Sequence, residues 1–351
     1  MNSIRQIWIV GAGGVGCVLG ARLERAVPDS VTLVDTWPEH IRALQDDGLT
    51  VDYPGEQVHV RPRTVSLGEL GTIADHPDLV VLAVKAYDTP AMLDAAVPHI
   101  GDAPILSLQN SINEELIAAT VGEARTIGGI CLYDGGLVAP GHGRLAMSHG
   151  KIVIGELDGT TTPRIEQVAE ALQASTPVRI TGNIWGELWT KLIRNVMVNA
   201  MAAVTDLGMG ELVLVPGCDR ICIGLGSEAV RVALERGYEL TTADLFDCPY
   251  EYPAQWYLQA PDSTERTQLE QSFHDSWVPH PTVYPSMLQD IRKKRRTEVE
   301  ALNGYIVEKG VELGLPTPLN AALTQLVLEC SATGTAPGRD RVVNTLLPLV
   351  A

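Results

Sequence analysis

The sequence lacks any hydrophobic run long enough to cross a bilayer, and the apolar stretch after Met1 is too short for the core of a secretory signal. We therefore expect no membrane segment and a cytoplasmic protein. Cysteine is scarce as well, with six residues in 351, and none of them has the spacing of zinc ligands. These observations predict free, buried thiols rather than disulfides, and no metal site.

Positive charge is the second deficit. The chain has 26 lysines and arginines against 43 acidic residues, which gives a formal net charge of −17. Such a field repels phosphate backbones and anionic lipids, so nucleic acid and membrane surfaces are excluded as partners. A small anionic ligand would have to be bound by local cations. The one basic run, residues 292–296 (RKKRR), lies in a segment with helical periodicity and is interpreted as a solvated helix face.

The length of the chain and the order of its apolar runs predict two domains, with residues 1–182 forming an α/β dinucleotide-binding domain. Short runs rich in β-branched residues and leucine alternate with helix-length segments, which is typical of a parallel sheet. A turn-rich stretch, APGHGR at 139–144, suits a hairpin. The predicted strands are residues 6–10, 31–34, 79–84, 105–108, 126–130 and 151–155.

Residues 183–351 have the three- and four-residue apolar spacing of amphipathic helices and are predicted to form an all-α domain. An aromatic and proline-rich stretch at about 247–285 contains Trp256 and Trp277 and is interpreted as an ordered insert. Its aromatic rings could form a lid over a bulky substrate, or pack the insert onto its own domain or a second copy. The predicted helices are residues 184–204, 228–245, 287–313 and 320–329.

A G-x-G-x-x-G motif directly follows the first predicted strand and opens a helix. Glycines at these positions allow a tight turn and the close approach of backbone to a pyrophosphate, which then faces the N-terminus of the helix. The alternative is a simple glycine turn. The predicted cofactor loop comprises Gly11, Ala12, Gly13, Gly14, Val15 and Gly16.

Asp35 ends the second predicted strand, 19 positions after Gly16. A carboxylate there can accept hydrogen bonds from ribose hydroxyls and would repel a 2′-phosphate. The sequence therefore favours NAD as cofactor, with NADP possible and Arg42 the residue that could reverse the preference. A helix-capping role for Asp35 remains open.

Lys191, Asn195 and Asn199 are spaced four apart and share one helix face. One cation and two amides on a stripe can hold a polar ligand, and amides beside an apolar stripe need partners. For an arbitrary helix, the simpler interpretation is an exposed ion pair between Lys191 and Glu187.

Several segments together resemble the ketopantoate reductase family. The resemblance covers most of the chain and implies a Rossmann-type N-terminal domain followed by an all-α C-terminal domain like that of 6-phosphogluconate dehydrogenase. It implies an NAD(P)-dependent oxidoreductase acting on CH–OH, with 2-dehydropantoate to pantoate as the reference reaction. The matching segments are GAGGVG, VKAYDT around Lys85, LQN ending at Asn110, ELWTKLIRNVMVNAMAAVTD (187–206), SMLQDIRKKRRTEVEALNG (286–304) and GLPTPLN (314–320).

By this resemblance Lys191 is the general acid, and Glu298 binds the substrate hydroxyl and adjusts the lysine. The residues that hold the substrate would be Asn110, Asn195, Asn199 and Ser286, while Lys85 and Asn110 would also contact the cofactor. Without the resemblance, Glu298 would be interpreted as a surface carboxylate paired with Lys294 or Arg295. Asp290 and Asn303 match too, but a structural role is the simpler interpretation for both.

The sequence departs from the family where an arginine or other basic residue usually binds the 2′-phosphate, because Asp35 lies there instead. Three functions remain open. The first is the reference reduction of a small anionic 2-keto acid. The second is an NAD-dependent catabolic dehydrogenase of a bulkier 2-hydroxy acid, such as an aromatic one, and the third is a dinucleotide sensor without catalysis. The sequence is compatible with a monomer or a homodimer.

Overall fold

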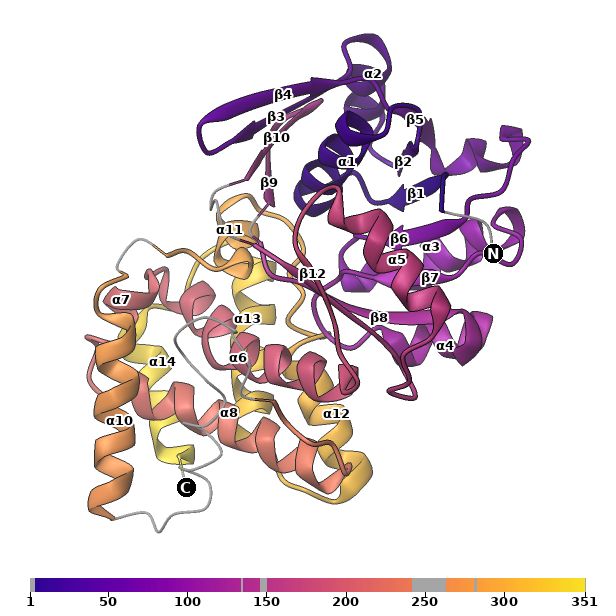
Figure 1. Cartoon of the computed structure of the whole chain (residues 1–351). Coiled ribbons are helices and arrows are strands. Elements are labelled where there is room, and N and C mark those ends of the chain that lie inside the picture. The colour runs from indigo at the N-terminus through magenta and orange to yellow at the C-terminus, as the bar shows by residue number, and fades with distance from the viewer. Residues whose placement is uncertain (1–3, 134, 146–149, 242–262, 281–282, 351) are drawn as a thin grey trace. The chain divides into compact units, whose positions relative to one another are not determined.

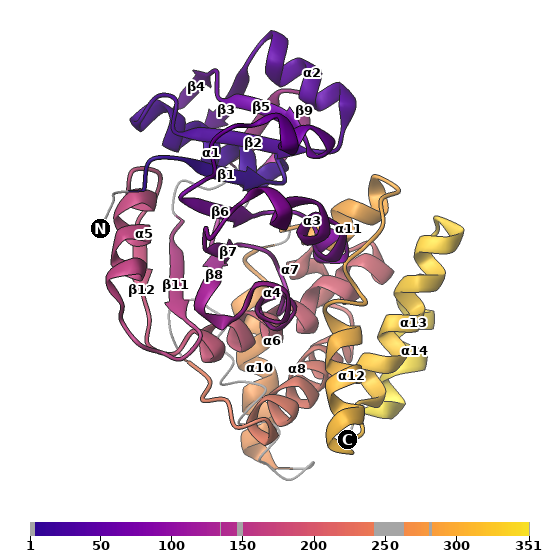
Figure 2. The same cartoon turned by 90° about the vertical axis from the view of Figure 1, so that its right-hand side faces the viewer.

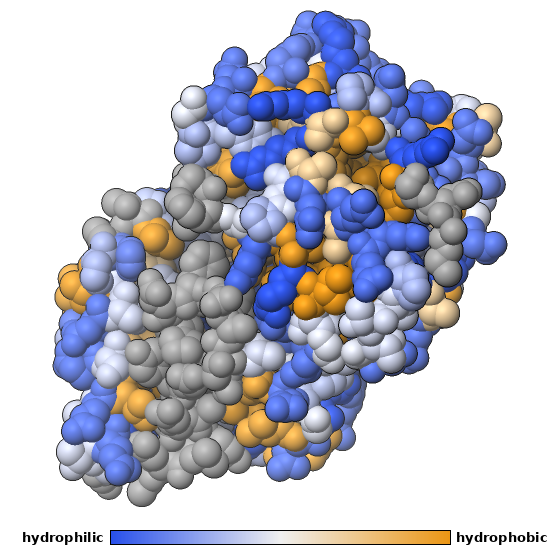
Figure 3. Space-filling model, viewed as in Figure 1, coloured by the Kyte–Doolittle hydropathy of each residue, from blue (hydrophilic) through white to orange (hydrophobic). Residues whose placement is uncertain are grey.

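A computed structural model describes residues 4–133, 135–145, 150–241, 263–280 and 283–350. The chain divides into two compact units, Met1–Ile184 and Trp185–Ala351. Among the described residues, no helix is both long and apolar enough to cross a membrane. On the face drawn in Figure 3, hydrophilic residues cover much of the described surface, with smaller hydrophobic areas between them.

The first unit is built on an eight-stranded sheet with the order β12-β11-β8-β7-β6-β1-β2-β5 (Figure 1). All neighbouring strands are parallel except β11 and β8, which are antiparallel. Counted along the chain, its first six strands have the order 3-2-1-4-5-6 of a Rossmann fold, as expected. The strands are β1 (Ile7–Val10), β2 (Val31–Asp35), β5 (Arg63–Ser66), β6 (Leu79–Leu82), β7 (Ile105–Ser107), β8 (Thr126–Cys131), β11 (Ile152–Glu156) and β12 (Val178–Ile180).

Helix α5 (Pro163–Gln173) lies on one side of this sheet and helices α3 (Thr89–Ala96) and α4 (Glu114–Val121) on the other (Figure 2), and each face carries a hydrophobic core. Because successive side chains of a strand point to opposite faces, Ile7 and Ile9 of β1 enter one core, while Trp8 and Val10 enter the other. The first core is shared with α1 (Gly14–Ala26) and α5, and the second with α3 and α4. Helix α2 (Pro38–Asp46) follows β2.

A second, four-stranded sheet packs on α1 and was not predicted as a sheet (Figure 1). Its order is β4-β3-β10-β9, and the predicted hairpin is its antiparallel pair β9–β10, with Ala139 opposite His142. Strands β3 and β10 pair in parallel, although they lie far apart in the sequence. The strands are β3 (Leu49–Tyr53), β4 (Glu56–Val60), β9 (Gly135–Ala139) and β10 (His142–Leu145).

The second unit is helical in its described residues, as predicted. Helix α8 packs against α10, α12, α13 and α14. The five described cysteines of the whole chain are buried and free, as expected, while Cys248 lies outside the described residues. The helices are α6 (Ile184–Thr205), α7 (Met209–Leu212), α8 (Cys218–Glu235), α10 (Thr264–Trp277), α11 (Ser286–Arg292), α12 (Asn303–Leu313), α13 (Pro318–Thr333) and α14 (Arg339–Leu346).

Two predicted helices were wrong in extent. The helix predicted for residues 228–245 begins earlier, at Cys218, and ends at Glu235. The single helix predicted for residues 287–313 is two helices separated by turns, with Lys294 in a left-handed conformation at φ 53°. The RKKRR run is therefore exposed, as predicted, but it begins at the last residue of α11 and continues beyond the helix instead of forming a helix face.

The described part of the predicted insert contains α10, whose Trp277 and Phe273 are buried. Arg194 of α6 lies over the Trp277 ring at 5.7 Å from its centroid. This contact favours packing of the insert on its own domain over a lid that includes Trp277. Trp256 lies outside the described residues.

A buried polar network ties four helices of this unit together. The Glu228 carboxylate on α8 accepts the backbone N–H groups of Leu319 (2.9 Å) and Asn320 (3.0 Å) at the start of α13. A carboxylate at a helix N-terminus also interacts favourably with the helix dipole. The Asn320 amide donates to Glu228 (2.8 Å) and to the Leu225 carbonyl (3.1 Å), and it accepts from Asn303 (2.9 Å). Asn303 thus has the structural role expected for it.

Replacing Asn320 by alanine should lower the free energy of unfolding by about 2–4 kcal/mol, because its three buried partners, on α8 and α12, lose hydrogen bonds. Urea unfolding of the variant and the wild type measures this difference. The matched control is Asn344→Ala on the exposed face of α14, which should change the stability by less than about 0.5 kcal/mol. Equal stability of the two variants would contradict a structural role for the network.

Candidate active site

The predicted cofactor residues of the first unit all follow the carboxyl ends of neighbouring strands. The glycine loop follows β1, Asp35 ends β2, Lys85 follows β6, and Asn110 follows β7. The strand order reverses between β1 and β6. In open α/β sheets, ligands bind at the carboxyl ends of the strands at such a reversal point. The fold therefore brings these residues to the sheet edge at which open α/β sheets bind ligands.

Two of the three motif glycines, Gly11 and Gly16, are required by sterics within the chain. Gly11 has a φ of 102°, and a Cβ there would lie 2.7 Å from the Val84 nitrogen. Gly16 packs against the carbonyl oxygen of Gly11, which leaves no room for a side chain between α1 and β1. A Cβ on Gly13, by contrast, would meet nothing within 4 Å. This open position is where backbone can approach a pyrophosphate.

The N-terminus of α1 is suited to an anion. Its capping residue is Gly13, which offers no side-chain hydrogen bond, and its first turn contains no acidic residue. The first N–H groups of a helix have no partner within the helix and carry a partial positive charge. Together with the opening at Gly13, this helix end fits the phosphates of a dinucleotide.

The Asp35 carboxylate is fixed by backbone donors. One oxygen accepts the N–H of Ala12 in the glycine loop (2.8 Å), and the other accepts the N–H groups of Thr36 (2.7 Å) and Trp37 (2.9 Å). Asp35 does not cap α2, because the N-cap of that helix is Trp37 and receives no side-chain capping bond; Asp35 orients the two residues that precede the helix. The carboxylate also remains partly exposed. It can therefore serve a ligand as well as the loop.

A buried side-chain network joins the loops that carry Lys85 and Asn110. The Gln109 amide donates to the Val84 carbonyl (3.0 Å) and to the Thr89 hydroxyl (2.7 Å). The Asn113 amide donates to the Asn110 carbonyl (2.7 Å). These contacts fix the backbone on which both predicted cofactor residues are mounted.

The residue after Asn110 is strained. Ser111 has a φ of 72°, a left-handed conformation that costs a residue with a side chain about 1 kcal/mol. Strain of this kind persists where the surroundings enforce it, and it occurs preferentially at functional sites. The conformation directs the chain from β7 into α4 immediately after the predicted substrate-binding amide.

Glu114 begins α4 and is completely buried, and its carboxylate accepts the N–H of Asn113 (3.0 Å). Burial raises its pKa from the ordinary value of 4.5 to about 7, although nearby hydrogen-bond donors oppose this shift. The folded state therefore holds this proton more tightly than the unfolded state. The resulting stabilisation is fully present below pH 4.5 and is lost as the pH rises to about 7.

The Glu114→Gln variant should remove this pH dependence. Relative to the wild type, its free energy of unfolding should increase by about 3 kcal/mol between pH 4.5 and pH 8, since one pKa unit corresponds to about 1.4 kcal/mol. Urea unfolding at several pH values measures the difference between the two proteins. The exposed Glu123→Gln variant controls for the loss of one carboxylate. A constant difference between Glu114→Gln and wild type across this range would rule out the raised pKa.

In the second unit, Lys191, Asn195 and Asn199 lie along α6 as predicted. Lys191 and Asn195 are half-buried and Asn199 is buried. Glu187, the alternative ion-pair partner of Lys191, is buried as well, so this face of the helix is not the exposed one that the alternative assumed. The half-buried stripe suits a ligand-binding role.

Ser286 is half-buried at the first position of α11, and Glu298 lies in the turns between α11 and α12. Glu298 is only 4% exposed. The interpretation of Glu298 as a surface carboxylate paired one helical turn away is therefore wrong, because the segment is neither helical nor exposed at this residue. A buried carboxylate in a turn is consistent with a functional position.

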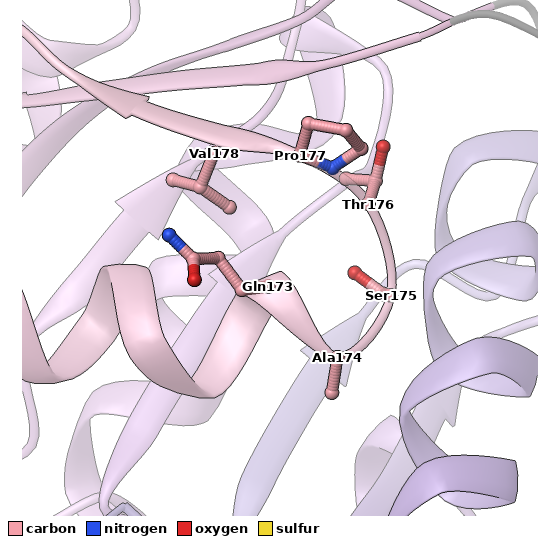
Figure 4. A pocket seen from close by; sticks show the side chains of 6 residues that line it. All are labelled: Gln173, Ala174, Ser175, Thr176, Pro177 and Val178. Atoms are coloured by element: carbon pink, nitrogen blue, oxygen red, sulfur yellow. The ribbon is translucent and has the colours of Figure 1, made fainter.

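The described residues also form an open pocket of about 460 Å³ between α5 and β12, lined by residues 173–178 (Figure 4). Two of its polar groups are already hydrogen-bonded to the backbone of the protein: the Ser175 hydroxyl donates to the Leu172 carbonyl, and the Thr176 hydroxyl donates to the Gly150 carbonyl. Figure 4 shows the Ala174 side chain pointing away from its neighbours. None of the predicted site residues lines this pocket.

Two family models match almost the whole chain: ketopantoate reductase PanE/ApbA over residues 7–159, and ketopantoate reductase PanE/ApbA C terminal over residues 183–330. The chain belongs to the ketopantoate reductase family. The expected fold and the expected NAD(P)-dependent oxidoreductase class are thereby confirmed.

Individual relatives agree with this family. A 2-dehydropantoate 2-reductase of Pyrococcus horikoshii is 30% identical over 329 residues, which is 92% of this chain and 96% of the relative. A ketopantoate reductase structure from Ralstonia eutropha is 28% identical, with a TM-score of 0.77 over 94% of this chain and 99% of that one. A ternary structure of D-mandelate dehydrogenase with NADH and anilino(oxo)acetate is 26% identical, with a TM-score of 0.79 over the same shares.

The supporting residues Thr89, Gln109 and Asn113 were missed by sequence reasoning. Thr89 and Gln109 lie inside VKAYDT and LQN, two of the segments that resemble the family, so the sequence did draw attention to their neighbourhood. Their role was hidden because it depends on contacts between two loops that follow different strands of the ketopantoate reductase sheet.

Proposed function

We propose that this member of the ketopantoate reductase family uses NADH to reduce a small 2-keto acid to the 2-hydroxy acid. The carrying observation is the Asp35 carboxylate, held beside an open glycine loop at the reversal point of the sheet. A bound nicotinamide supplies the hydride that the carbonyl carbon accepts. The protein then has to bind both molecules and supply one proton.

The preference for NADH follows from the hydrogen-bond capacity of Asp35. A carboxylate has about four acceptor sites, and three backbone N–H groups use three of them. The remaining site can accept a ribose hydroxyl, but it has no favourable contact to offer a 2′-phosphate. Arg42, the cation that could reverse this preference, is exposed on α2 and lies 3.8 Å from Glu39. The Glu39 carboxylate therefore offsets part of the positive charge that Arg42 could offer to a 2′-phosphate.

In the proposed chemistry, Lys191 donates a proton to the carbonyl oxygen as hydride reaches the carbon, and Glu298 binds the resulting hydroxyl. Asn110, Asn195, Asn199 and Ser286 hold the carboxylate and hydroxyl of the substrate. Amides and hydroxyls suit this task because they bind an anion without adding charge beside the proton donor. Lys85 and Asn110 contact the cofactor.

Two substrates merit testing. The curated relatives are 2-dehydropantoate 2-reductases, which makes 2-dehydropantoate the first candidate. The second candidate is an aromatic 2-keto acid, because Asp35 favours NAD and because D-mandelate dehydrogenase with bound NADH is among the similar structures. Absorbance of the reduced nicotinamide, followed with 2-dehydropantoate and with the keto acid of mandelate, separates the two candidates.

NADH should exceed NADPH in kcat/KM by at least about 10-fold, because a carboxylate beside a 2′-phosphate costs more than about 1 kcal/mol. The Asp35→Ala variant should lose most of this preference, mainly by losing activity with NADH. Steady-state rates with both cofactors measure the ratio. The control is Glu39→Ala, which removes one exposed acidic charge from α2 and should keep the preference. Faster turnover of the wild type with NADPH would reverse the assignment.

The Lys191→Met variant should reduce kcat by about 10²–10⁴-fold and leave the affinity for NADH unchanged, because it removes the proton donor and retains the apolar stem. Turnover and fluorescence titration with NADH measure the two effects separately. Lys293→Met, in the exposed basic run, is the matched control and should behave as the wild type. If Lys191→Met turned over at the rate of the wild type, the lysine would not be the acid.

A further inference from the structure

Ala12, inside the glycine loop, is held through both its backbone N–H and its carbonyl oxygen. Its N–H donates to Asp35, and its carbonyl oxygen accepts from His40 Nε2 (2.8 Å) and from the Cys17 thiol (3.0 Å). His40 comes from α2 and Cys17 from α1, so two helices and β2 meet at one residue of the loop. The loop is therefore fixed in one conformation before any ligand binds.

His40 is completely buried, and its protonation is determined by its partners. Its Nδ1 accepts the backbone N–H of Gly141 (2.9 Å), which can only donate. The ring proton must therefore lie on Nε2, from which it is donated to Ala12. Burial lowers the pKa of His40, while the nearby Asp35 carboxylate opposes the shift. The imidazole is thus a neutral, rigid ring.

Trp37 lies flat against this ring. The two ring centroids are 5.5 Å apart and the planes differ by 19°. The backbone N–H of Trp37 also donates to the Asp35 carboxylate. Trp37 nevertheless remains 37% exposed, since the imidazole supports only one side of it. A large aromatic ring that is fixed on one side and open to solvent on the other is a ready stacking surface.

The covalent structure of a dinucleotide assigns a ligand to this surface. In the proposed function, the glycine loop holds the phosphates and Asp35 holds the ribose hydroxyls. The base is attached to the ribose that Asp35 would hold, and Trp37 is bound to the same carboxylate through its backbone N–H. We propose that Trp37, supported by His40, is the platform on which the adenine of the cofactor stacks. This inference rests on dinucleotide binding in the proposed function.

Binding of ADP-ribose tests the platform without any turnover, because this probe contains the adenosine and the pyrophosphate but no nicotinamide. The Trp37→Ala variant should bind ADP-ribose and NADH on the order of 10–100-fold more weakly than the wild type, as expected for loss of one base–aromatic stack. Trp37→Phe should restore most of the affinity. Titration calorimetry measures all three proteins.

Reduced nicotinamide mononucleotide, which lacks adenosine, distinguishes a platform from a general loss of structure. Its affinity should be equal in wild type and Trp37→Ala. The control variant is Leu116→Ala on α4, an apolar residue of similar exposure (39%) that should leave the affinity for ADP-ribose unchanged. In addition, ADP-ribose should quench a part of the intrinsic fluorescence that Trp37→Phe lacks.

These measurements distinguish failure of dinucleotide binding from failure of the Trp37 platform. If the wild type binds neither ADP-ribose nor NADH, the proposed function fails, and this inference fails with it. If the wild type binds both and Trp37→Ala binds them equally well, dinucleotide binding stands and the platform is refuted. Equal weakening of the mononucleotide and of ADP-ribose in Trp37→Ala would also refute it, because the substitution would then act on the whole site.

Discussion

The hydrogen bond from the Ala12 N–H to the Asp35 carboxylate is the contact on which the cofactor region depends. It joins the loop after β1 to the end of β2 and so couples the two features that are proposed to bind different parts of a dinucleotide. The same carboxylate accepts the backbone N–H of Trp37, which precedes α2. His40 of α2 in turn donates to the carbonyl oxygen of Ala12. The glycine loop, β2 and α2 are therefore linked to one another by hydrogen bonds, so a movement of one of them would break a bond to another.

Local pattern was sufficient to predict this region of the fold. The glycines, the strand before them and Asp35 lie within one continuous βαβ unit, in which spacing in the sequence determines spacing in the structure. The four-stranded sheet lacked such a signal. Strand β3 pairs with β10, so Thr50 lies opposite His142, and no local pattern relates residues so far apart. Without that pairing, the role of Gly141 as the partner of His40 could not be foreseen either.

The helical unit illustrates the opposite problem, a periodic pattern that continues through a break. Apolar spacing over residues 287–313 predicted one helix, yet the chain turns at Lys294 without the glycine or proline that usually signals such a turn. The break decides the environment of Glu298. On a continuous helix it would face Lys294 across one turn, whereas between α11 and α12 it is buried. Only the resemblance to the family singled out this glutamate, because its burial depends on tertiary structure.

The strongly acidic composition makes pre-oriented contacts important for binding an anionic cofactor. A protein of net charge −17 repels dinucleotides and keto acids at long range, so binding must rely on short-range, directed contacts. Backbone N–H groups at the start of α1 provide such contacts without any cation, but only if they already point in the right direction. Every loose peptide in the loop would cost conformational entropy on binding. Fixing Ala12 through its N–H and its carbonyl oxygen removes part of that cost in advance. In the proposed binding mode, oriented dipoles then take the place of positive charge.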